Sequence, residues 1–157
     1  MEFLESNQVS AWAEAHGLTC EDGRELQVPA VPAVHRGAYA HGRRSGAEAR
    51  VVEDLIGRLG EWDECLVVIT LWNVWSSSED WPTFYAWRGA RGERRSLNIA
   101  PGHLFVQSEG PLLTELLTLV MENAWDAAVL PSWHDRATGL HAKISHDEWY
   151  EIRGAHA

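Results

Sequence analysis

The stretch CLVVITLW at residues 65–72 decides the fold, because it is the longest apolar run in the chain. It is rich in β-branched residues and far too short to cross a bilayer, so it predicts a buried strand rather than a membrane helix. A run that is apolar at every position is typical of a strand covered on both faces by helices. We therefore expect this strand at the centre of the sheet.

The flanking sequence predicts helices and shorter strands around this strand. Apolar residues at helical spacing predict helices at about residues 3–16, 51–59, 81–88 and 111–124. Short apolar stretches predict further strands at residues 103–107, 126–130 and 140–144. Ser145 to Glu148 matches a capping box and predicts a final short helix. Between residues 18 and 45, prolines and glycines leave room for at most one short strand, Leu26 to Val28, in a long irregular connection.

This order of elements predicts one α/β domain over residues 1–157, with α+β as the alternative. We expect a mixed sheet of about four strands packed by four to five helices. The N-terminus lacks the layout of a signal peptide, and Cys20 and Cys65 form no CxxC pair. Two isolated thiols fit a reducing compartment, so the expected location is the cytoplasm, with no membrane contact.

The formal net charge is −10, which disfavours nucleic acid as a partner. Residues 59–87 hold five acids and no basic residue, namely Glu61, Asp63, Glu64, Glu79 and Asp80. The same segment is rich in tryptophan. Trp75 lies in a polar stretch and Trp87 falls outside the apolar stripe of its helix, so both are expected to be partly exposed. The arginines that follow, at positions 88, 91, 94 and 95, are expected to form a solvated helix end.

Carboxylates and indoles on one surface suit a basic protein partner. The acids speed encounter through long-range attraction, and desolvated aromatic rings hold the complex together. In class and composition the chain resembles the immunity proteins that neutralise bacterial toxins. The resemblance implies a non-enzymatic inhibitor of a basic toxin, without a cofactor. In that function the five acids steer the partner, and Trp75 and Trp87 anchor it.

Two other functions remain open from the sequence. A small metal-dependent hydrolase could use His134, His141 and His146 with Asp147 or Glu148, although their spacing matches no compact metal motif. Acids at the start of a helix also have a structural role, because they complement its dipole. A ligand-binding regulatory domain with a tryptophan-rich pocket is the third function. Nucleotide enzymes and serine hydrolases are disfavoured, since the chain has no phosphate-binding glycine loop and no G-x-S-x-G elbow.

Overall fold

The computed structural model describes residues 1–21, 25–27, 31–40, 47–72, 81–133, 136–137 and 139–154. The α-helices are α1 (Ser6–Ala15), α2 (Ala47–Leu59), α3 (Trp81–Gly89) and α4 (Gly110–Glu122), and a short 3-10 turn, η1, covers Gln107–Glu109. The strands are β1 (Glu2–Leu4), β2 (Thr19–Glu21), β3 (Glu25–Gln27), β4 (Ala33–Ala38), β5 (Glu64–Leu71), β6 (Gly102–Val106), β7 (Asp126–Trp133), β8 (Arg136–Ala137), β9 (His141–Ser145) and β10 (Trp149–Arg153). None of the helices in these segments is long and apolar enough to cross a bilayer.

The main sheet has the strand order β1-β6-β5-β7-β9-β10-β4, and β8 pairs with β7 beside this path. Every pairing between the described strands is antiparallel. The chain is therefore a single α+β domain, and the prediction of a mixed sheet of about four strands is wrong. The error has a physical cause. Burial on both faces requires a helical layer on each side of a strand, but it does not require parallel neighbours.

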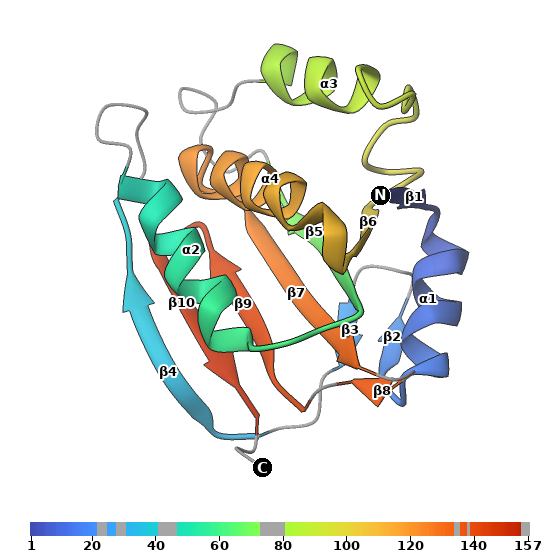
Figure 1. Cartoon of the computed structure of the whole chain (residues 1–157). Helices are drawn as coiled ribbons and strands as arrows, with labels where there is room; N and C mark the ends of the chain where they lie inside the picture. The colour runs from blue at the N-terminus through green and yellow to red at the C-terminus, as the bar shows by residue number, and fades with distance from the viewer. Residues whose placement is uncertain are drawn as a thin grey trace.

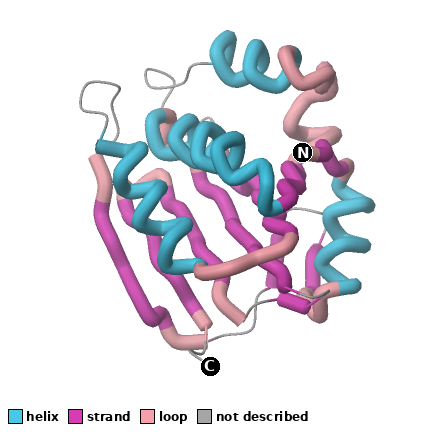
Figure 2. The backbone as a smooth tube through the Cα atoms, viewed as in Figure 1, coloured by secondary structure: helices cyan, strands magenta, loops and turns pink. Residues whose placement is uncertain are grey.

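Strand β5 contributes side chains to two apolar cores. Figures 1 and 2 show α2 and α4 lying across one face of the main sheet. On one face, Cys65, Val67 and Ile69 belong to the larger core beneath α2, α3 and α4. On the other face, Leu66 and Val68 belong to a smaller core formed with α1. All five side chains are fully buried. The prediction of a strand covered on both faces is therefore confirmed for residues 65–69, whereas β5 ends at Leu71, which is exposed.

The four helices predicted from apolar spacing are present, with shifted ends. The apolar stripe of α4 is buried through Leu113, Leu116, Leu117 and Val120. In α2, Arg58 Nε lies 2.7 Å from Asp54 Oδ2, an ion pair at i,i+4 spacing. Helix α1 begins at Ser6 rather than near residue 3, because Glu2–Leu4 form an edge strand paired with β6.

The C-terminal segment differs from the prediction. Residues 146–148 form a turn rather than the start of a helix, and Glu148 adopts a left-handed φ of 62°. The turn joins β9 to β10, and alternate residues Tyr150 and Ile152 enter the larger core. Strand β7 also continues past Pro131, because its last two residues pair with β8. A capping-box pattern occurs in turns as well as at helix starts. Here the apolar residues Tyr150 and Ile152 alternate with polar ones, and this period of two favours a strand over a helix.

Three strands occupy the described part of residues 18–45, where we expected at most one. Strands β2 and β3 form a separate hairpin. Strand β4 pairs with β10 and forms one edge of the main sheet. Its side chains are mostly exposed, so it lacks the buried apolar pattern by which a strand is recognised in sequence.

Candidate functional site

Three of the predicted acidic residues lie together at the start of β5. Glu64 is its first residue, and its Oε2 accepts a 3.0 Å hydrogen bond from the indole Nε1 of Trp12 in α1. Asp63 is exposed and fixed by its backbone, since its N–H donates to Ser132 and its carbonyl accepts from Gln107. Glu61 is exposed two residues earlier in the chain. These carboxylates therefore lie at or just before one end of β5, where hydrogen bonds hold the backbone of Asp63 and the side chain of Glu64.

Apolar side chains lie next to these acids. Val106 is directly opposite Glu64 in the β5–β6 pairing, so the two side chains share a face, and Val106 is 46% exposed. Leu104, on the same face of β6, is half-buried and packs with Trp12 against the smaller core. Leu104 is in turn opposite the exposed Glu2 of β1. An apolar centre inside a charged rim is typical of a protein-binding surface.

We call this surface the acidic patch. It comprises Trp12, Leu104 and Val106 in the centre and a charged rim, formed by Glu2 and Glu64 on the same face of the sheet and by the exposed Glu61 and Asp63 in the segment that leads into β5.

Trp87 does not belong to the acidic patch. Its Nε1 donates a 2.8 Å hydrogen bond to Glu115 of α4, and the guanidinium of Arg91 lies 4.2 Å from its ring centre. It is half-buried, as expected, but it packs on the side of the sheet opposite to Glu64. Trp75, Glu79 and Asp80 lie outside the described residues. In the sequence, Trp12 falls within the helix predicted at about residues 3–16. Its contact with Glu64, 52 residues further along, cannot be predicted from neighbouring residues.

The described histidines do not converge on a metal site. His141 is the first residue of β9 and His146 directly follows its last residue, so the two are roughly 16 Å apart along the chain. His146 Nδ1 is 2.8 Å from Asp126, and its Nε2 is 3.5 Å from Asp147. His141 is buried beside Arg153, and its pKa is lowered first by burial and then by that charge. No group of three metal-ligating side chains occurs within the described ranges, and His134 falls outside them.

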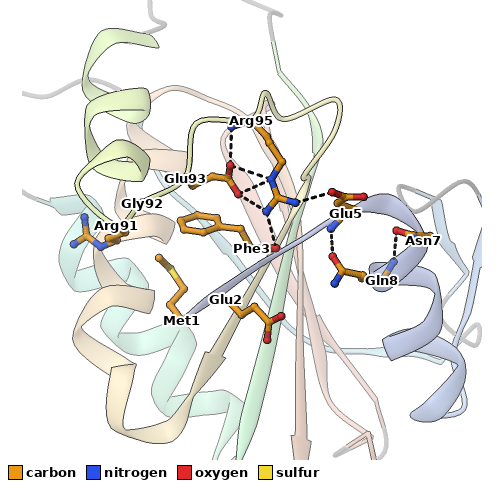
Figure 3. A pocket seen from close by; sticks show the side chains of 10 residues that line it. All are labelled: Met1, Glu2, Phe3, Glu5, Asn7, Gln8, Arg91, Gly92, Glu93 and Arg95. Atoms are coloured by element: carbon orange, nitrogen blue, oxygen red, sulfur yellow. Dashed lines mark hydrogen bonds and ion pairs between the residues drawn. The ribbon is translucent and has the colours of Figure 1, made fainter.

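A polar pocket of about 550 Å³ lies between β1, the start of α1 and the connection from α3 to β6 (Figure 3). Arg95 dominates its wall. The guanidinium donates to Glu93, to Glu5 Oε1 at 2.8 Å and to the carbonyl of Phe3 at 3.1 Å. Hydrogen bonds from Arg95 lower the pKa of Glu93. The polar groups around Arg95 are therefore already hydrogen-bonded to one another. Glu2, which also lines the pocket, is exposed and points away from Arg95 (Figure 3).

Behind this pocket, Arg88 is fully buried, so its assignment to a solvated helix end is wrong. Its Nη1 lies 3.1 Å from His103 Nε2, and its Nη2 donates to the carbonyls of Ala100 and Arg95. Burial, and then the charge of Arg88, lower the pKa of His103 to about 3. The pair thus pins the connection from α3 to β6. The sequence carried a signal for this, because Arg88 stands four residues after the buried Phe84, on the apolar face of α3.

Tryptophans of the larger core pack against one another and against its other aromatic rings. Trp81 stacks on Trp125 with ring centres 5.0 Å apart, and Phe84 meets Trp125 edge-on at the same distance. Trp62 and Trp125 are buried. The pocket of Figure 3 is lined by no tryptophan.

Comparison with protein-family models, with curated proteins and with solved structures finds no match for this chain. Because no relative indicates a function, we infer one from the structure, and among the described surfaces we use the acidic patch.

Proposed function

We propose that the chain is a non-enzymatic inhibitor of the immunity-protein type, which binds a basic protein toxin through the acidic patch. The observation that carries the proposal is the pairing of Glu64 with the exposed Val106 on one face of the sheet. It places a carboxylate and an apolar contact side by side on rigid strands. Rigid presentation matters because ordering flexible side chains on binding costs affinity.

Charge supports the same proposal. The rim of the acidic patch contributes four carboxylates, on a chain whose net charge is −10. Such a field accelerates encounter with a cationic partner and repels polyanions. Contact of the partner with Trp12 and Val106 then slows dissociation. The sequence has two cysteines and no CxxC pair, which fits action in the cytoplasm, where a toxin would otherwise reach its target.

The test uses basic proteins encoded beside this chain in its genome as candidate partners. Co-expression should relieve the toxicity of the true partner, and the purified proteins should form a complex. Its association rate constant should fall steeply with added salt. An association rate constant that does not change with salt concentration, or relief of toxicity without a complex, contradicts the proposal.

Matched variants locate the surface. Glu61→Lys should slow association several-fold, whereas Glu53→Lys, the same change at an exposed site on α2, should have a much smaller effect. Val106→Ser should speed dissociation, whereas Ile99→Ser, at another exposed apolar residue, should not. Equal effects within each pair would place the binding surface elsewhere.

A further inference from the structure

The far face of strands β9, β10 and β4 carries a group of basic side chains. In the sheet register, Glu151 of β10 lies opposite Lys143 of β9 on one side and opposite Arg36 of β4 on the other. Arg153 is two residues further along β10, so it shares this face. The intervening Ile152 points the other way into the larger core. We call Arg36, Lys143, Trp149, Glu151 and Arg153 the basic face.

Glu151 organises the arginines of the basic face. Its Oε2 accepts from Arg36 Nη2 at 2.7 Å, and its Oε1 accepts from Arg153 Nε at 2.6 Å. Burial raises the pKa of Glu151, but the two arginines more than offset this and hold the pKa below its ordinary value. The Glu151 side chain is 1% exposed, whereas those of Arg36 and Arg153 are 65% and 41% exposed. A buried anion therefore fixes cations that still face solvent.

The indole ring of Trp149 makes cation–π contacts with two of the cations. The guanidinium of Arg36 lies 5.2 Å from the centre of its ring, and the ammonium of Lys143 lies 5.6 Å from it. These contacts come from the strands on either side of β10, which carries the ring. The indole is thus engaged with cations of the chain itself and is poorly placed to stack on a nucleic acid base.

The basic face has an excess of positive charge on an acidic protein. Three cations stand against one carboxylate, which leaves two positive charges, while the whole chain has a net charge of −10. Within a Debye length of about 8 Å at physiological salt, the local charges govern what docks. Arg36 and Arg153 also keep N–H groups beyond those that bind Glu151, and such groups bind carboxylates well.

We propose that the basic face binds an acidic segment of a partner protein through its carboxylates. A short acidic segment needs only a few carboxylates to pair with the three cations of the basic face. A nucleic acid brings a continuous row of phosphates that the remaining acidic surface repels, and it finds no free aromatic ring here. This surface is of opposite charge to the acidic patch, so the inference goes beyond the proposed function and does not depend on it.

The experiment measures binding of a fluorescently labelled, short poly-glutamate peptide to the full chain by anisotropy at low salt. Lys143→Gln and Arg36→Gln should each raise the dissociation constant about five-fold. The matched control is Arg50→Gln, which removes the same charge from an exposed site on α2 and should leave the constant unchanged. Because Arg36 also supports Glu151, thermal unfolding checks that variant, while Lys143→Gln leaves both ion pairs of Glu151 intact.

Three results would overturn the proposal. The first is the absence of peptide binding to the unmodified chain at low salt. The second is equal weakening by all three variants, which indicates non-specific attraction. The third is tighter binding of an oligothymidylate of the same charge, lost in the Lys143 and Arg36 variants, which assigns the basic face to nucleic acid instead.

Discussion

The indole of Trp12 donates its hydrogen bond to a carboxylate 52 residues further along the chain, that of Glu64. The bond connects α1 with the first residue of β5 and closes one end of the smaller core. It also orients one carboxylate of the acidic patch. The patch therefore depends on tertiary contacts, and its orientation is coupled to the stability of α1.

The coupling between Trp12 and Glu64 should be measurable in a double-mutant cycle. From the unfolding free energies of Trp12→Phe, Glu64→Ala and the double variant in urea, we expect a coupling of about 0.5–1.5 kcal/mol. The same cycle on Trp87 and Glu115, whose hydrogen bond is solvent-exposed, should give a smaller value. A coupling at Trp12 no larger than at Trp87 contradicts this role.

The buried His103 should make the protein lose stability as the pH falls. Its pKa is about 3 in the folded state, against 6.5 for an unperturbed histidine, because burial and then Arg88 disfavour the charged form. The unfolded chain therefore binds an extra proton below about pH 6.5. The stabilisation is complete above that pH and is lost as the pH falls towards 3, by up to about 1.4 kcal/mol per unit.

Chemical denaturation between pH 7 and pH 5 measures this loss, and His103→Gln should make it shallower. A glutamine can still accept a hydrogen bond from Arg88, so the change of slope separates titration from a general loss of packing. His141→Gln should act in the same direction, since burial and then Arg153 lower the pKa of His141. An unchanged slope in His103→Gln would show that His103 is not the titrating group.

Two glycines should respond in opposite ways to the same substitution. A Cβ on Gly37 would overlap the ring of Tyr150, whose hydroxyl donates to Asp54 at 3.1 Å. Gly37→Ala should therefore cost about 1–3 kcal/mol of unfolding free energy. In the last turn of α2, Gly57 has open space around its Cα, so Gly57→Ala should stabilise the protein by about 0.5 kcal/mol. Thermal unfolding of both variants tests the contrast, which fails if both change in the same direction.

The fold was predictable wherever one element had a strong pattern of its own. The buried strand within residues 65–72 and the stripe of α4 are each predicted from neighbouring residues, and both elements are present, the strand with its buried part at residues 65–69. The strand order and its antiparallel sense could not be read this way, because they depend on pairings between distant segments. Strand β4 was missed for a related reason, since its residues are mostly exposed and gain their structure from β10.

The candidate site was only partly predictable. The acids at residues 61–64 are consecutive enough to be seen in the sequence, and the structure presents them at one end of β5. Their apolar neighbours Val106 and Trp12 come from remote elements, and nothing local distinguishes them from core residues. The basic face was invisible for the same reason. Its three cations stand on three strands and meet only through the register of Glu151.

Gathering carboxylates in the acidic patch should cost the free protein stability. Glu61 and Asp63 are both exposed and only two residues apart, with Glu64 next to them, so they repel one another when no partner is bound. Glu61→Gln should therefore raise the unfolding free energy at low salt by a few tenths of a kcal/mol, and the gain should disappear at high salt. Glu53→Gln on α2 is the matched control, and its gain should be smaller. Urea denaturation at two salt concentrations measures both variants. A loss of stability in Glu61→Gln would mean that this carboxylate serves the fold itself, and the acidic patch would then need no partner to explain its charge.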